Sequence, residues 1–132
     1  MEERVRWSTV LVVPRGDQFI ALARGFQPRD TNFPGGSSAP EDTCPEETAI
    51  RQLYEETGLR RSPEDMRLID ESVGADGQPV YAYFVTTFSG RARSGCEGKV
   101  FWTAHLARLT SRYASHGEHA KRLLQKLQRV AA

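Results

Sequence analysis

Apolar and polar positions along the chain follow the spacing of strands in several segments. Residues 7–13 (WSTVLVV) are rich in apolar and β-branched side chains, and a Pro-Arg-Gly-Asp turn separates them from a second apolar run at residues 19–23. Similar runs cover residues 66–73, 80–88 and 99–102. Such runs bounded by turn residues are typical of β-strands. The pattern predicts a sheet of about five strands.

Residues 45–57 (PEETAIRQLYEET) instead have the spacing of a helix, with Ala49, Ile50 and Leu53 on its apolar side. Pro45 suits the first helical turn, and Gly58 follows as a stop signal. A short helical turn is predicted at residues 104–109 and a closing helix at residues 116–129. Two strands, a helix, further strands and a last helix predict an α/β fold with helices packed on a mixed sheet.

Residues 24–45 separate the second strand from this helix and are dense in Pro, Gly, Ser, Asp and Asn. We expect them to lack regular structure, and long loops of this kind usually carry function.

Length and composition limit the classes of protein that the chain can belong to. Its 132 residues predict one domain, over residues 1–132. The net charge of +1 provides no overall field toward nucleic acid or a membrane surface. Cys44 and Cys96 are too few for a disulfide framework. No apolar run is long enough for a membrane span, and the first residues are charged, so we expect a cytoplasmic protein.

One side of the predicted helix is acidic and faces the long loop. Gln52, Glu55 and Glu56 lie three and four residues apart, so we expect them on the same side, with the two glutamates side by side. Carboxylates beside an irregular loop can hold a hard cation such as Mg²⁺, which prefers oxygen ligands. The alternative is a solvated helix face on which Glu55 pairs only with Arg51.

Residues 33–59 (FPGGSSAPEDTCPEETAIRQLYEETGL) resemble the Nudix box. That box has a glycine, five free positions, a glutamate, seven free positions, and then Arg-Glu-apolar-any-Glu-Glu-any-Gly-apolar. Gly36 is followed by five residues and Asp42, and residues 51–59 (RQLYEETGL) match the second half at every fixed position except Gln52. The chain is therefore similar to the Nudix hydrolases, MutT-like enzymes.

Three departures from the box affect what the resemblance implies. Asp42 replaces a glutamate, and eight residues rather than seven separate it from Arg51. Gln52 replaces the glutamate after the arginine, which is usually a metal ligand in the family, and an amide offers only a neutral oxygen. We expect the extra residue near Thr43 or Cys44, before the helix begins.

The resemblance implies a Nudix-like α/β/α sandwich that cleaves a diphosphate linkage in a nucleoside diphosphate derivative, with Mg²⁺ or Mn²⁺ as cofactor. The implied metal ligands are the carbonyl of Gly36 and the side chains of Glu55, Glu56 and Asp42. Arg51 is expected to orient Glu55, and Gln52 is a marginal catalytic residue. The segment Glu97-Gly98-Lys99-Val100-Phe101-Trp102 resembles a later loop in relatives, which makes Glu97 the candidate base or ligand that compensates for Gln52.

The sequence offers several candidate residues for substrate recognition and favours none of them. Arg24 and Arg29 can reach phosphates, and four aromatic residues can stack on a base, although a surface charge or a core aromatic is the favoured interpretation of each. The four are Phe26, Phe33, Tyr81 and Tyr83. We expect a small nucleotide as the ligand, and the sequence does not indicate an oligomeric state.

A catalytically weak Nudix domain that binds a nucleotide or RNA end is the main alternative to an enzyme. Gln52 favours it, as does a basic last stretch, whereas the pair Glu55 and Glu56 opposes it. The basic residues are Arg108, Arg112, Lys121, Arg122, Lys126 and Arg129. A purely structural subunit has no positive feature to support it.

Overall fold

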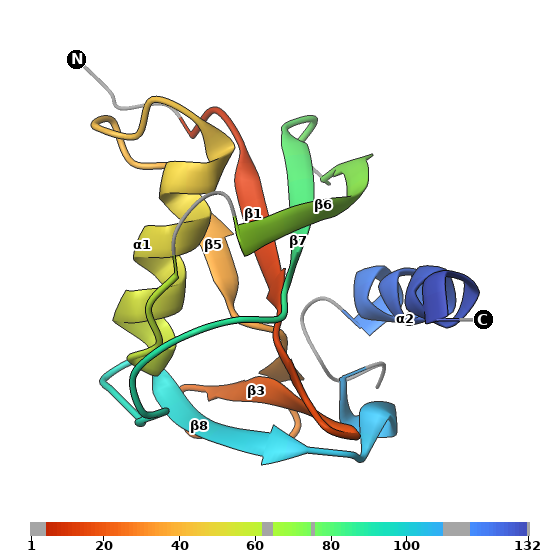
Figure 1. The fold of residues 1–132 in the computed structure, drawn as a ribbon. Coiled ribbons are helices and arrows are strands. Elements are labelled where there is room, and N and C mark those ends of the chain that lie inside the picture. Colours follow the sequence, from red (N-terminus) through yellow and green to blue (C-terminus); the bar gives the residue numbers. More distant parts are fainter. Residues whose placement is uncertain (1–4, 62–64, 75, 110–116, 132) are drawn as a thin grey trace.

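The computed structural model describes residues 5–61, 65–74, 76–109 and 117–131 (Figure 1). Its elements, in chain order, are β1 (Ser8–Val12), β2 (Pro14–Arg15), β3 (Gln18–Arg24), β4 (Thr31–Asn32), β5 (Gly35–Ser37), α1 (Pro45–Thr57), β6 (Met66–Val73), β7 (Pro79–Val85), β8 (Gly98–Thr103), the short 3₁₀ helix η2 (Leu106–Arg108) and α2 (Gly117–Ala131).

The strands form two sheets rather than one sheet of about five strands. The first has the order β5-β1-β7-β6, and β1 and β7 are parallel while the other pairs are antiparallel. In the second, β3 pairs with β2, β4 and β8, always antiparallel. Each strand has only two hydrogen-bonding edges. β5 and β7 occupy the two edges of β1. β8 lines one edge of β3, and β2 and β4 pair with opposite ends of its other edge.

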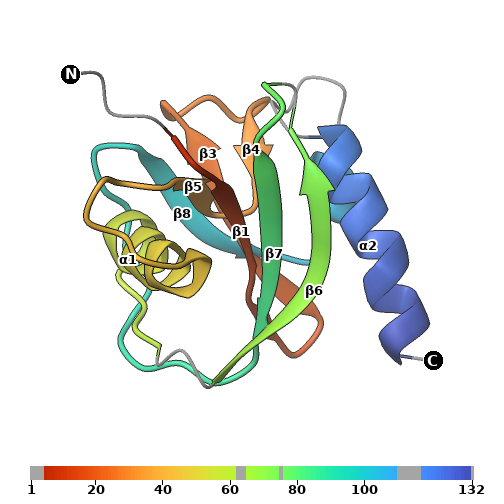
Figure 2. The same ribbon diagram turned by 90° about the horizontal axis from the view of Figure 1, so that it is seen from above.

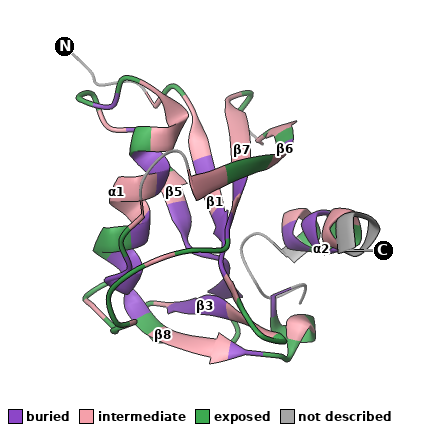
Figure 3. Ribbon diagram, in the orientation of Figure 1, coloured by how far each residue is buried: buried purple, intermediate pink, exposed green. Residues whose placement is uncertain are grey.

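The two long helices lie on opposite sides of the strands (Figure 2). Leu11 shares a buried cluster with Leu53 of α1, whereas its neighbour Val12 shares another with Leu123 of α2. Successive side chains of a strand point to opposite faces, so β1 is covered on both. Buried residues concentrate on the strands and on the inward side of α1 (Figure 3). The predicted α/β fold class is confirmed.

Helix α1 has the predicted bounds. It follows Cys44, whose backbone is extended, and it ends at Gly58, whose left-handed φ of 81° allows its N–H to donate to the carbonyl of Tyr54 at 2.9 Å. Gly58 is therefore the stop that its position predicted. Strand β6 also has the predicted bounds.

The expectation of no regular structure in residues 24–45 was wrong in part, because β4 and β5 lie within that range. β5 pairs with β1, with Thr9 opposite Gly36. Gly35 has a φ of 155°, and a Cβ there would lie 2.1 Å from the carbonyl oxygen of Thr9. Glycine thus permits a close strand pairing for which the side-chain pattern gives no signal.

The closing helix α2 begins at Gly117. Residue 116, where the prediction began it, is outside the described residues. Within the described part of the chain, no helix is long and apolar enough to cross a membrane.

Candidate active site

Glu56 is the buried carboxyl at the centre of the site. It lies on the last turn of α1 and is 4% exposed. Its Oε1 accepts a hydrogen bond from the backbone N–H of Gly35 at 2.7 Å. Its Oε2 lies 3.5 Å from Nη1 of Arg24, whose Nη2 donates to the carbonyl of Gly35 at 3.2 Å. The end of β3, the start of β5 and α1 therefore meet at this carboxyl.

A second carboxyl, that of Glu97, interacts electrostatically with Glu56. Burial, together with the hydrogen bond and charge of Glu97, raises the pKa of Glu56 from 4.5 to about 8, against the opposing effects of the Gly35 N–H and Arg24. Two carboxyl groups can share a hydrogen bond only when one of them carries a proton. Because its pKa is about 8, Glu56 holds a proton at neutral pH, in a buried position beside a second carboxyl.

Glu55 does not lie beside Glu56, contrary to the sequence-based expectation. Its side chain is 48% exposed, and its Oε2 is 3.2 Å from Nη1 of Arg51, one turn earlier. Adjacent positions on a helix are about 100° apart, so one side chain can be buried against β5 while the next faces solvent. Arg51 does contact Glu55, and its orienting role stays a prediction.

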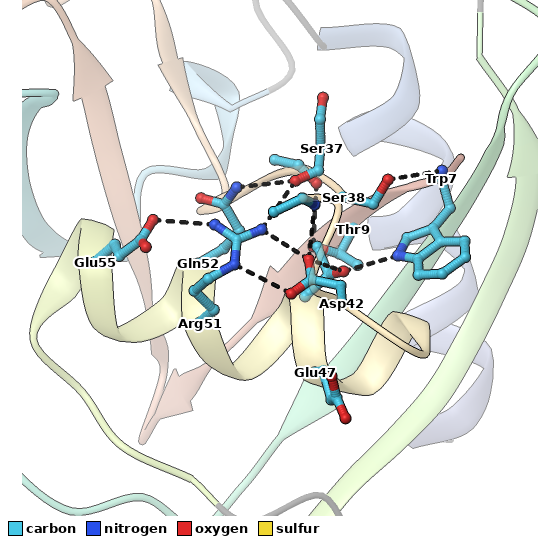
Figure 4. Close-up of polar contacts among 12 residues, drawn as sticks. Trp7, Thr9, Ser37, Ser38, Asp42, Glu47, Arg51, Gln52 and Glu55 are labelled. Carbon is cyan, nitrogen blue, oxygen red and sulfur yellow. Dashed lines mark hydrogen bonds and ion pairs between the residues drawn. The ribbon is translucent and has the colours of Figure 1, made fainter. Parts of the chain in front are cut away.

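Asp42 is a buried carboxylate surrounded by donors (Figure 4). Its Oδ2 accepts hydrogen bonds from the N–H of Ala39 at 2.8 Å, from Oγ1 of Thr48 at 2.7 Å and from Nη2 of Arg51 at 2.9 Å. Burial acts to raise the pKa of Asp42, but hydrogen bonds from Arg51, Ala39 and Thr48 outweigh it and lower the pKa from 3.8 to about 2. Asp42 is thus ionised and already saturated by the protein.

Trp7, just before β1, extends this network, because its Nε1–H donates to Oγ1 of Thr48 at 2.8 Å. Thr48 in turn donates to Asp42. The indole therefore helps fix the beginning of α1 and the loop before it, which positions Arg51.

Gln52 lies across Gly36. Its Nε2 donates to the carbonyl of Ser37 at 3.3 Å, and a Cβ at Gly36 would be only 2.4 Å from this nitrogen. The carbonyl of Gly36 accepts a hydrogen bond from Oγ1 of Thr9 at 3.4 Å. Gln52 therefore contacts the backbone at the edge of the site and adds no charge to it.

The donor set fits a divalent cation. Glu56 and Glu97 supply two interacting carboxyl groups, and Gly36 directly follows the Gly35 whose N–H donates to Glu56. The described residues contain no cluster of three His, Cys, Asp or Glu side chains that can hold a metal. Mg²⁺ typically takes only one or two carboxylates and completes its octahedron with waters and substrate phosphates.

The fold is an α/β/α domain, and its candidate site is a pair of carboxyl residues beside Gly35 and Gly36. The family model described as NUDIX domain matches residues 4–123, and the chain belongs to this family. It is a Nudix-type pyrophosphohydrolase. Members of this family generally use a divalent metal. No curated protein matches the chain.

Solved structures with similar folds include a MutT NUDIX hydrolase from Burkholderia pseudomallei, with a TM-score of 0.69 and 20% identity over 92% of this chain and 99% of that one. An ADP compounds hydrolase has a TM-score of 0.68 and 16% identity over 96% and 74%. An Ap4A hydrolase from C. elegans has a TM-score of 0.64 and 18% identity over 94% and 98%.

Arg24 is the site residue to which sequence reasoning gave too little weight. The available signal was its position at the end of a strand, directly before the glycine-rich loop. The basic last stretch gives less support to nucleotide or RNA binding than its charge suggested, because two of its residues are paired within the protein. Arg122 contacts the buried Asp70 of β6 at 3.1 Å, and Lys126 also hydrogen-bonds to it. Arg112 and the side chain of Arg129 are outside the described residues.

Proposed function

We propose that the chain hydrolyses the diphosphate linkage of a nucleoside diphosphate derivative, with Mg²⁺ or Mn²⁺ bound at Glu56. The contact between Glu56 and Glu97 carries this proposal. Two carboxyl groups held together, one of them buried, are poorly stabilised unless a proton or a cation lies between them. Because Nudix hydrolases generally use a divalent metal, a cation is the proposed functional occupant.

Glu56 is the proposed principal ligand. The carbonyl of Gly36, which follows the Gly35 that donates to Glu56, and the carboxylate of Glu55 are proposed as additional ligands. When bound, the ion neutralises phosphate oxygens and lowers the pKa of the attacking water. The guanidinium of Arg24 holds Glu56 in place. The Arg24 side chain is 29% exposed, so it is also available to a phosphate oxygen.

Glu97 is the proposed general base. Its carboxylate would accept a proton from the attacking water. The water oxygen then forms a bond to phosphorus, the bond from phosphorus to the bridging oxygen breaks, and the leaving phosphate takes the electron pair. Glu97 is exposed, as a base that must exchange its proton with solvent should be.

Asp42 and Arg51 are proposed as positioning residues rather than ligands. Every donor around Asp42 would lose its partner if that carboxylate turned toward a cation. Arg51 contacts Asp42 through Nη2 and Glu55 through Nη1, so it links the loop that contains Asp42 to Glu55.

A panel assay tests the proposal. Wild type would be incubated with nucleoside triphosphates, ADP-linked compounds and dinucleoside polyphosphates, with Mg²⁺ and then Mn²⁺, and the products separated by chromatography. We expect metal-dependent cleavage of at least one compound and none by the Glu56→Gln variant. A wild type that cleaves nothing, beside a Gln52→Glu variant that cleaves strongly, would contradict the proposal and support a nucleotide-binding module.

A further inference from the structure

Residues 24–27 form a turn in which Phe26, a bulky residue, has a positive φ. Gly25 has a φ of 58° and Phe26 a φ of 60°, and the N–H of Gln27 donates to the carbonyl of Arg24 at 3.0 Å. Two successive left-handed residues inside such a turn favour Gly, Asn or Asp. Phe26 is the one non-glycine residue with positive φ among the described residues. A bulky side chain is therefore held here against backbone preference.

This turn is attached to both carboxyl residues of the site. Arg24 pairs with Glu56, and the N–H of Gly25 donates to the carbonyl oxygen of Glu97 at 2.8 Å. Consecutive Cα atoms are about 3.8 Å apart. Phe26 thus follows directly after two residues that contact the two acids, at the border of the site.

The ring of Phe26 has no evident role in the core. It is 58% exposed, whereas Phe33 is 5% and Tyr83 2% exposed, and both lie in the buried clusters. Tyr81 is partly buried and packs against the cluster beneath α1. Of the four aromatic residues that the sequence offered for base stacking, Phe26 combines exposure with a position beside the acids.

We infer that Phe26 is the stacking platform for the nucleobase of the substrate, an inference that rests on the proposed function. With a phosphate held near Arg24 and Glu56, the attached nucleoside would lie along the turn, where the ring offers a flat apolar face. A base stacks on an aromatic side chain through its π-face without needing hydrogen bonds. A strained backbone that presents a ring beside a site is the kind of feature that function maintains.

The test measures how wild type and a Phe26→Asn variant bind two ligands, one with a nucleobase and one without. In Phe26→Asn the turn keeps a residue suited to positive φ but loses the ring. Calorimetry with Mg²⁺ would measure binding of α,β-methylene-ADP, which carries a base, and of methylenediphosphonate, which does not. We expect the variant to bind the nucleotide about tenfold more weakly and the diphosphonate unchanged. Its Tm should stay equal or rise.

Two controls accompany this test. Phe26→Tyr keeps the ring and should retain nucleotide affinity. Val73→Asn removes another exposed apolar side chain, 73% exposed on β6, and should change neither affinity. Undiminished nucleotide binding by Phe26→Asn would overturn the inference, as would equal weakening toward both ligands with a fallen Tm.

The outcomes also separate this inference from the proposed function. Wild type that hydrolyses diphosphates but binds both ligands equally would overturn only the inference. Ring-dependent nucleotide binding without any hydrolysis would overturn only the proposed function. Binding of neither ligand would overturn both.

Discussion

Two buried carboxyl groups at opposite ends of α1 are held in opposite states. Asp42 is surrounded by donors and has a pKa lowered to about 2, whereas Glu56 is buried against another carboxyl and has a pKa raised to about 8. Burial disfavours both charges, so the difference comes from their partners. A carboxylate whose lone pairs are filled by protein donors stabilises structure. One that lies beside a second acid is stabilised by a proton or by a cation.

The largest expected effect comes from removing the charge that Glu56 offers. Glu56→Gln keeps the shape, and its amide can still accept from Gly35 and donate to Glu97. We expect hydrolysis to fall by about a thousandfold or more, because the site loses its principal anionic ligand. Single-turnover rates with saturating Mg²⁺ would measure this. A rate within tenfold of wild type would remove Glu56 from the site.

Glu97→Gln should lower the rate by about a hundredfold, the usual scale for losing a positioned general base. Nucleotide binding should persist, because the principal ligand and Arg24 remain. Rate and affinity measured on one preparation separate the two effects. Loss of affinity with an unchanged maximal rate would instead make Glu97 a binding residue.

Asp42→Ala should affect stability before chemistry. It leaves Arg51, Thr48 and the Ala39 N–H without their acceptor, at a cost of about 2–3 kcal/mol in the free energy of unfolding. The folded pKa of Asp42 is lowered, so its stabilisation is present above pH 3.8 and is lost as the pH falls toward about 2. Urea titrations of variant and wild type should therefore differ at pH 7 and converge progressively as the pH falls from 3.8 toward about 2.

If Asp42 were a metal ligand, as the sequence pattern implied, Asp42→Ala would weaken Mg²⁺ binding at a temperature where the variant is fully folded. Unchanged Mg²⁺ affinity with lowered stability is the result that a positioning role predicts.

The smallest effect is expected for Gln52→Glu. A partly exposed charge contributes little, so the rate should change by no more than about threefold, with somewhat tighter Mg²⁺ binding. The wild-type reaction would already depend on Glu56 and Glu97. A large gain in turnover would show that Gln52 had silenced the site.

The sequence predicted those parts of the fold that side-chain pattern controls. Residues 45–57 and 66–73 have the predicted bounds, because proline, glycine and apolar spacing mark their ends and faces. β5 was missed because its pairing depends on Gly35 having no side chain. The division into two sheets depends on which strand edges are free, a property of the whole chain.

The site was predictable to a lesser extent. Spacing placed Glu55 and Glu56 on one helix, but helical geometry alone could not tell that only Glu56 is buried. Family resemblance, rather than spacing, indicated Glu97. The saturation of Asp42 depends on the position of Thr48 and on a backbone turn at Ala39. The catalytic and metal-binding roles themselves stay predictions.

The most direct test of the central claim is the count of protons released when Mg²⁺ binds. Calorimetry at pH 7 in two buffers of different ionisation enthalpy gives this number. We predict release of roughly one proton per bound ion in wild type, because the proton held by Glu56 must leave, with less release as the pH rises above about 8. Glu56→Gln should show neither this release nor comparable affinity. Equal Mg²⁺ binding by both proteins, or binding by wild type without proton release, would contradict the account.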